Sequence, residues 1–291
     1  MTIAGFVLLN KPKGLSSQQA IYRLRKKLNL PKNIKIGHGG TLDPLATGML
    51  VVALGSGTKF LGYLLNANKT YSVTAKLGQI TDTLDAEGEI LSESPVPDIK
   101  QADLLALFKQ FTGPIEQIPP MFSALKFQGK PLYHYARKGE EIERKPRSVH
   151  IYEMLLNENN PESFSFTTKV SKGTYIRSLV HDMGQVLGCG AHVEQLHRAQ
   201  VDPFLSEKML ELEQINVEHL IPIESIFTEL EPLYFNAINL KKLKSGQKLA
   251  NIPVICGSSD TLYRAYDTEN NQFVGLLKMD EQQRIIGEKW V

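Results

Sequence analysis

The chain has 291 residues, of which 42% are hydrophobic and 22% are charged, and its formal net charge is +2. This composition is typical of a globular protein with a proper core, and the small net charge excludes a uniformly basic coat for nucleic acid. The apolar runs are too short for a membrane-spanning helix or a signal peptide, and Cys189 and Cys256 are too far apart for a disulfide framework or a zinc motif. We therefore expect a reduced, soluble, cytoplasmic protein.

The first two thirds of the chain mix helical and strand patterns without a regular βαβ repeat. Ser16 or Ser17 can cap a helix whose apolar residues Ile21, Leu24 and Leu28 recur at helical spacing. Alternating apolar residues predict strands, and glycines after apolar-periodic segments predict helix ends. In chain order the sequence predicts a strand at 5–9, a helix at 17–28, a strand at 70–77, a helix at 99–111, a strand at 164–170 and a helix at 176–187. This mixture favours an α+β fold.

The composition changes after Phe227, and the chain turns to short strand-like segments after Glu231-Pro232. Short strand-like segments at 254–256, 262–266, 273–277 and 284–286 are separated by turns rich in glycine and asparagine. Strands of this length and spacing predict a small barrel or sandwich. We therefore predict a larger domain at residues 1–228 and a small all-β domain at residues 232–291.

Charge is segregated along the chain. Residues 1–42 carry eight Lys and Arg and no acid, and residues 126–147 carry seven Lys and Arg against three glutamates. Residues 207–231 carry seven glutamates and one lysine. This pattern suggests one face for a polyanion and another for solvent, although charge runs are also common on ordinary solvated faces.

Asp43 is the first carboxylate of the chain and lies in a segment unusually rich in glycine. Glycine and proline are common in ordinary turns, so the segment alone leaves a plain loop and a functional site as equal alternatives. It is not a dinucleotide-binding loop, because Leu42 stands where that fingerprint requires glycine. The segment reads Gly37-His38-Gly39-Gly40-Thr41-Leu42-Asp43-Pro44-Leu45-Ala46-Thr47-Gly48.

This segment resembles the catalytic loop of the TruB family of tRNA pseudouridine synthases. Other segments resemble the family's further motifs and follow in the family's order over about two hundred residues. They are residues 11–17 (KPKGLSS), 69–71 (KTY), 77–78 (LG), 81–88 (TDTLDAEG), 117–126 (QIPPMFSALK), 129–130 (GK), 173–179 (GTYIRSL) and 190–193 (GAHV).

The resemblance implies an enzyme that isomerises uridine to pseudouridine at position 55, in the T loop of tRNA. It also implies a curved mixed sheet with the active cleft across its middle, and a small PUA-like RNA-binding domain at the C-terminal end. The reaction breaks the N1–C1′ bond, turns the uracil and joins C5 to C1′. Because the atoms balance, we expect no redox cofactor, nucleotide or metal.

The resemblance also implies roles for single residues. Asp43 is the carboxylate that attacks or deprotonates the sugar or base. Arg177 is its partner, and a cation within about 4–6 Å is expected to reverse the upward pKa shift of a carboxylate in a dry site. Tyr71 stacks on the flipped uracil, and its hydroxyl helps to move the C5 proton. Leu196 closes the pocket, and His38 stacks in the gap that the flipped base leaves.

Lys11 and Lys130 are further expected to bind the substrate. We expect the partner to be the T-arm of tRNA, with no metal, no small-molecule cofactor, no membrane association and a monomeric protein. Three residues depart from the family's usual pattern and weaken the expected hold on the RNA backbone: Gly39, His197 and Asp202.

Two other functions are compatible with parts of the pattern. The first is a tRNA-binding chaperone on the same fold whose catalysis is incidental or lost. The second is a metal-free hydrolase of glycosidic bonds, which usually needs two opposed carboxylates. Asp82 or Asp85 is a candidate for the second carboxylate, but neither is close to Asp43 in sequence.

Overall fold

The computed structural model describes residues 3–250 and 259–291. The predicted strand at 254–256 lies outside the described residues. The other predicted strands and helices are all present, with ends that differ from the expectation by a few residues.

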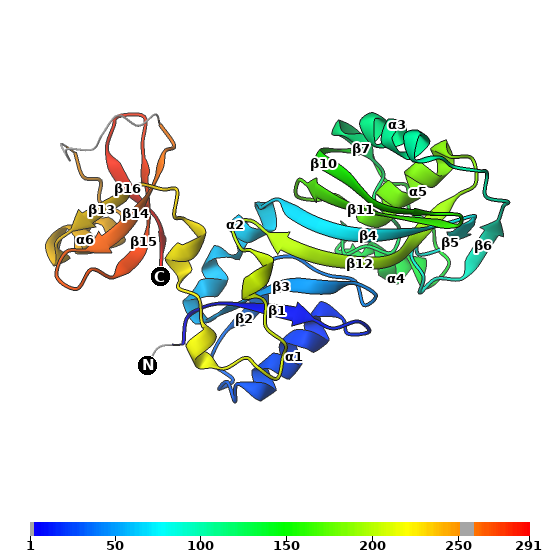
Figure 1. The fold of residues 1–291 in the computed structure, drawn as a ribbon. Coiled ribbons are helices and arrows are strands. Elements are labelled where there is room, and N and C mark those ends of the chain that lie inside the picture. Colours follow the sequence, from blue (N-terminus) through cyan, green and yellow to red (C-terminus); the bar gives the residue numbers. More distant parts are fainter. Residues whose placement is uncertain (1–2, 251–258) are drawn as a thin grey trace.

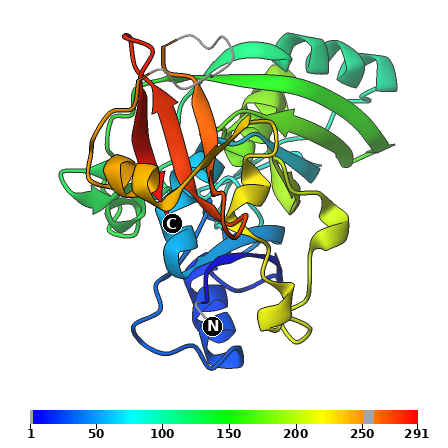
Figure 2. The same ribbon diagram turned by 90° about the vertical axis from the view of Figure 1, so that its left-hand side faces the viewer.

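Eight strands form one large mixed sheet in the order β1-β3-β12-β4-β11-β10-β7, with β2 paired to β3. Their bounds are β1 Gly5–Lys11, β2 Ile36–His38, β3 Thr47–Leu54, β4 Lys69–Leu77, β7 Gly113–Gln117, β10 Arg147–Asn160, β11 Ser163–Val170 and β12 Ala191–Val201. The long strands follow a curved path (Figures 1 and 2).

The pairing of β12 with β3 is parallel and joins just two residue pairs, His197 with Thr47 and Arg198 with Gly48. A Cβ on Gly48 would lie 2.4 Å from the Arg198 carbonyl oxygen, so glycine is required where the two backbones approach. The part of the sheet that contains β1, β2 and β3 therefore meets the rest of the sheet over a short contact. The segment that carries Asp43 leads directly into this contact.

One face of the sheet is covered by three helices, α1 (Ser17–Lys27), α3 (Gln101–Phe111) and α5 (Ile176–Val186). The Ser16 side chain caps α1 and forms a capping box with Gln19. Strand β4 alternates strictly between buried and half-buried residues, and its buried side chains join the core beneath the helices.

A second core covers the opposite face where β1 and β3 lie. It includes Phe6, Phe60 and Phe227, which come from β1 and from two later segments. The segment after β12 crosses this region, with bridges from Leu210 to Leu9 and from Ile221 to Phe6. Its three 3₁₀ helices are η2 Ser206–Lys208, η3 Val217–His219 and η4 Ile223–Ile226.

Shorter elements complete the large sheet's surroundings. They are η1 Gly55–Phe60, α2 Leu61–Asn66, the hairpin β5 Gln79–Thr81 with β6 Ile90–Glu93, the hairpin β8 Lys126–Phe127 with β9 Lys130–Pro131, and α4 Leu132–Ala136.

The C-terminal part forms a separate four-stranded sheet in the order β13-β14-β15-β16, with helix α6 packed beside it (Figure 1). The elements are β13 Pro232–Phe235, α6 Ala237–Lys244, β14 Leu262–Asp267, β15 Phe273–Met279 and β16 Ile285–Trp290. Leu276 and Phe273 of this sheet pack against Phe60 and Phe227 in the second core. The expected α+β class with an added C-terminal β-sheet region is confirmed, helix α6 was not predicted, and the boundary near residue 230 stays a prediction.

Candidate active site

The segment that carries Asp43 is fixed by helix α1 and the turn before it. Ser17 Oγ accepts a hydrogen bond of 2.8 Å from the Leu42 amide and donates one of 2.9 Å to the Leu42 carbonyl. The Gly14 amide donates to the Pro44 carbonyl at 2.8 Å. Asp43 therefore stands between two anchored neighbours, and its carboxylate has a defined position.

The Asp43 carboxylate forms the expected ion pair with Arg177, the second residue of α5. The distance from Arg177 Nε to Asp43 Oδ2 is 2.9 Å. The guanidinium also donates to the carbonyls of Thr83 at 2.8 Å and Phe122 at 2.7 Å, and it is 5% exposed. Three segments, at Asp43, Thr83 and Phe122, thus converge on one guanidinium, whose ion pair with Asp43 orients the carboxylate.

Asp85 is a second buried carboxylate at this site. Its Oδ2 lies 3.5 Å from Arg177 Nη1, and its Oδ1 accepts hydrogen bonds from Thr83 Oγ1 at 2.6 Å and from the Glu87 amide at 3.1 Å. Asp43 thus has an acidic neighbour in space that its sequence position concealed. Both carboxylates contact the same guanidinium rather than facing each other across a gap, which disfavours the hydrolase alternative.

Burial raises the pKa of Asp43 above its ordinary value, although Arg177 lowers it and Asp85 adds a smaller upward contribution. The Asp43 side chain is 37% exposed, but it lies among protein atoms at the meeting of two cavities, so loss of solvent still dominates. The expectation that Arg177 would reverse the upward shift is therefore wrong. The guanidinium divides its charge between two carboxylates.

An inner cavity of about 300 Å³ opens beside Asp43. Tyr71 from β4 and Leu196 from β12 line it, and both side chains are more than nine-tenths buried. Leu196 is directly paired with Val73 across the two strands, which sets it diagonally from Tyr71. The structure thus brings the predicted stacking and closing residues to the same cavity as the predicted carboxylate.

An outer cavity of about 610 Å³ shares one wall with the inner cavity. His38, Tyr133 and Arg137 line it. The His38 Nδ1 accepts a hydrogen bond of 3.4 Å from the Gly40 amide, and burial followed by the charge of Arg198 lowers the His38 pKa. The residues that border both cavities are Thr41, Leu42, Asp43, Ser123, Ala124 and Arg177.

Arg198 was not singled out as a site residue from the sequence, yet it holds the Asp43 segment at both ends. Its guanidinium donates to the carbonyls of Gly40 at 2.9 Å, Thr41 at 3.3 Å and Met49 at 2.8 Å. The side chain is 2% exposed. One buried cation therefore joins β12 to the segments before and after Asp43.

Lys69 is a second cation that the sequence did not single out. Its ammonium donates to the carbonyls of Leu64, Leu65 and Ala67, at the C-terminal end of helix α2. Burial, with a smaller contribution from Arg198, lowers the Lys69 pKa to about 8. This lysine borders the inner cavity and fixes the start of β4 two residues before Tyr71.

The expectation that Lys11 binds the substrate is not supported. Its side chain is fully buried, and its ammonium donates to the carbonyls of Pro12, Leu15 and Pro44. Burial lowers the Lys11 pKa to about 8, against the upward effect of Asp43. Lys11 therefore supports the Asp43 segment from beneath. Lys130 is exposed in the β8–β9 hairpin and does not line either cavity, and its substrate contact stays a prediction.

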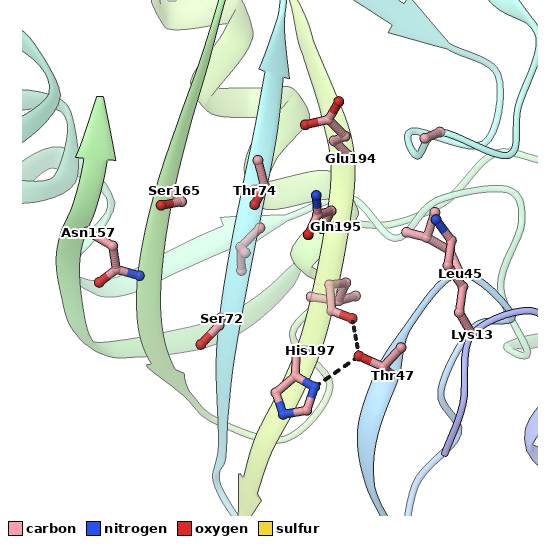
Figure 3. Close-up of a pocket in the computed structure, with 13 residues that line it drawn as sticks. Lys13, Leu45, Thr47, Ser72, Thr74, Asn157, Ser165, Glu194, Gln195 and His197 are labelled. Carbon is pink, nitrogen blue, oxygen red and sulfur yellow. Dashed lines mark hydrogen bonds between the residues drawn. The ribbon is translucent and has the colours of Figure 1, made fainter. Parts of the chain in front are cut away.

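Another cavity, of about 540 Å³, lies among polar side chains that alternate with the core residues of the same strands (Figure 3). Ser72, Thr74 and Gln195 line it, as does His197, whose Nδ1 lies 2.9 Å from Thr47 Oγ1. Neither Asp43 nor Arg177 reaches this cavity. We therefore place the chemistry in the inner cavity, although this one is larger.

The three departures from the family pattern have structural settings. A Cβ on Gly39 would lie 2.8 Å from Leu64 Cβ, so the segment packs closely against helix α2 at this position. His197 contacts Thr47, and Asp202 pairs with Lys169 at 3.0 Å on the surface.

The described residues contain no cluster of three or more His, Cys, Asp or Glu side chains that could hold a metal ion. None of the helices in the described part of the chain is long and apolar enough to cross a membrane.

Comparison with known families and proteins gives consistent matches. The family profile of the TruB family pseudouridylate synthase N-terminal domain matches residues 25–176, and that of the tRNA pseudouridylate synthase B C-terminal domain matches residues 177–231. The tRNA pseudouridine synthase B of Chromohalobacter salexigens is 40% identical over 286 residues, which cover 96% of this chain and 91% of the relative. That of Tolumonas auensis is 50% identical over 214 residues, which cover 74% and 65%.

Solved structures match the fold as well. A chain from the crystal structure of a Cbf5–Nop10–Gar1 complex superposes with a TM-score of 0.74 at 26% identity, covering 99% of this chain and 85% of that one. A chain from the archaeal box H/ACA sRNP Nop10–Cbf5 complex gives a TM-score of 0.70 at 23% identity, covering 99% and 86%. The second likeness concerns the fold alone.

Proposed function

The chain belongs to the TruB family and is a tRNA pseudouridine synthase, and from this premise we propose that it modifies uridine 55 in the T loop of tRNA, with Asp43 as the catalytic carboxylate. The observation that carries the proposal is the ion pair of Asp43 with Arg177 on the wall between two cavities. A uridine stacked in folded RNA must leave the stack to reach a buried carboxylate, so the proposal includes base flipping.

The two cavities suggest how the flipped nucleotide is held. The inner cavity, with the Tyr71 ring and the apolar Leu196 side chain, suits the uracil. The ribose then passes the wall where Asp43 stands, and the neighbouring nucleotides occupy the outer cavity beside His38 and Arg137. This placement puts the carboxylate next to C1′ and C2′, where the glycosidic bond breaks and re-forms.

The electrostatics of the wall suit a carboxylate that acts as nucleophile or base. Burial raises the pKa of Asp43 and so makes the carboxylate more basic, whereas Arg177 keeps it oriented and favours its ionised form. Asp43 adds to the uracil ring, bonds C1′ or removes the C2′ proton, and each of these routes uses an ionised carboxylate. The Tyr71 hydroxyl then assists the movement of the C5 proton after C5 has joined C1′.

We further propose that the protein acts as a monomer on the T-arm, with residues 1–228 as the catalytic domain and residues 232–291 as a PUA-like RNA-binding domain. Helix α6 supports the second assignment, because it places three lysines, Lys241, Lys242 and Lys244, in one short helix of the small domain. Cations on such a surface contact phosphates without reading sequence.

The direct test is to incubate the purified protein with unmodified tRNA and to map any pseudouridine by mass spectrometry. Product at position 55 supports the proposal, and product at another uridine overturns the assignment of the T loop. Binding without product would favour the chaperone, and release of free uracil would favour the hydrolase.

A further inference from the structure

Ser123 carries a buried hydroxyl that has no hydrogen-bond partner among the described residues. The residue is 5% exposed and borders both the inner and the outer cavity. Among the described residues, the side chains of Ser56 and His181 also hold a buried polar atom without a partner, but neither lines the two cavities at Asp43. A buried hydroxyl without a partner destabilises a folded protein, so its position at a substrate cavity points to a ligand.

The position of Ser123 is fixed by its backbone neighbours. The preceding carbonyl, that of Phe122, accepts a hydrogen bond of 2.7 Å from Arg177. The Ser123 amide donates to the Met121 carbonyl, and the Ser123 carbonyl accepts from the Tyr133 amide. The Ser123 hydroxyl therefore belongs to the residue directly after the one whose carbonyl binds the Arg177 guanidinium, and that guanidinium orients Asp43. Loop rearrangement is not needed to bring it to the wall.

The Tyr175 phenol is a neighbour of this hydroxyl. Burial raises the Tyr175 pKa and the neighbouring Ser123 hydroxyl lowers it, but the two groups do not meet hydrogen-bond geometry. A serine hydroxyl can donate one hydrogen bond and accept two. Capacity therefore remains for the substrate even if the two side chains approach each other.

We propose that Ser123 hydrogen-bonds to the 2′-hydroxyl of the flipped uridine and so contributes to the choice of RNA over DNA. This inference rests on the proposed function, which places the ribose at the wall shared by Asp43, Arg177 and Ser123. The uracil lies deeper, towards Tyr71. A phosphate would require a free cation, whereas the cation on this wall, Arg177, is already held by two carboxylates. The neutral Ser123 hydroxyl can instead form a hydrogen bond with the neutral 2′-hydroxyl of the ribose. The 2′-hydroxyl distinguishes RNA from DNA.

The test is a double-mutant cycle in binding. Protein with Asp43→Asn is used throughout so that the RNA is not converted, and Ser123→Ala and Ser56→Ala are each added to it. Ser56→Ala is the matched control, because it removes a buried unpaired hydroxyl that does not border these cavities. Each protein is titrated with tRNA transcripts that carry uridine or 2′-deoxyuridine at position 55.

We expect the 2′-deoxy substitution to weaken binding about 2- to 12-fold in the proteins that retain Ser123, which is the range for one neutral hydrogen bond. With Ser123→Ala the two transcripts should bind equally. Thermal unfolding of Ser123→Ala should occur at an unchanged or higher temperature, because the free protein loses an unsatisfied group. A serine with a purely structural role would instead lower it.

An equal 2′-deoxy effect with and without Ser123 would overturn the proposal, and so would the absence of any 2′-deoxy effect. Failure of the proposed function is seen separately, because wild-type protein would then form no pseudouridine at position 55 of the uridine transcript.

Discussion

Replacing Arg198 tests whether the position of Asp43 depends on one buried cation. Arg198 makes three hydrogen bonds, of 2.8, 2.9 and 3.3 Å, to carbonyls on both sides of Asp43. At about 1.5–3 kcal/mol for each bond from a charged donor, full removal has an upper range of about 5–9 kcal/mol. Relaxation and water entry reduce this, so we expect Arg198→Met to lower the free energy of unfolding by about 3–5 kcal/mol.

Arg198→Lys is the more informative variant, because it keeps the charge while losing the planar fork. An ammonium can reach one or two of the three carbonyls, so we expect a stability loss of about 1–3 kcal/mol. If Asp43 shifts by about 1 Å, kcat should fall by about 100-fold, while KM for tRNA stays near the wild-type value because phosphate contacts are retained.

The matched control is Arg25→Lys. Arg25 donates to the carbonyls of Pro31 at 2.9 Å and Ile34 at 2.6 Å, away from both cavities at Asp43. Urea denaturation gives the stability of each variant, and single-turnover pseudouridine formation gives the rate. Equal losses of stability in Arg198→Lys and Arg25→Lys, together with an unchanged kcat in Arg198→Lys, would refute the positioning role of Arg198.

Two further predictions follow from the burial of charged and apolar groups. The rate of pseudouridine formation should fall in acid below the raised pKa of Asp43, because the carboxylate must be ionised. Asp85→Asn should move this fall to lower pH, because it removes a negative charge that raises the pKa of Asp43. A pH–rate profile that does not move in Asp85→Asn would contradict the assignment. A chain that ends at Thr228 should aggregate or unfold at a lower temperature, because Phe273 and Leu276 no longer cover Phe60 and Phe227. A monomeric fragment in size-exclusion chromatography with full thermal stability would show that this contact is dispensable.

The sequence predicted the parts of the site that the family motifs contain. Asp43, Tyr71, Arg177 and Leu196 are far apart in the chain and meet at one cavity, as expected. Helix α5 and strand β4 were also predictable, because helical spacing and strict alternation survive in their sequences. A local sequence pattern therefore predicts a helix or strand correctly when that element is regular.

The sequence did not predict the supporting cations or most of the sheet. Strand β12 shifts register between Val193 and Gln195 and between Arg198 and Gln200, and β10 has two such irregularities. Each shift breaks the two-residue period on which strand prediction depends. The role of Arg198 depends on carbonyls of Gly40, Thr41 and Met49, which lie far away in the chain, so no local pattern could indicate it.

The prediction that Lys11 binds the substrate is not supported, for a different reason. A lysine in a basic segment is usually exposed, and only three carbonyls brought together by the fold make its burial possible. Asp85 was weighed only as an opposed carboxylate, because sequence separation hid the guanidinium that it shares with Asp43.

The most direct test of the central claim is single-turnover conversion of unmodified tRNA by Asp43→Asn. The substitution keeps the shape of the side chain but removes the charge that we propose acts on the ribose. We predict that pseudouridine formation at position 55 falls by about four orders of magnitude or more, as for the loss of a nucleophile or base, while tRNA binding is retained. An Asp43→Asn protein, verified by mass, that converts tRNA at a rate near that of wild type would contradict the account.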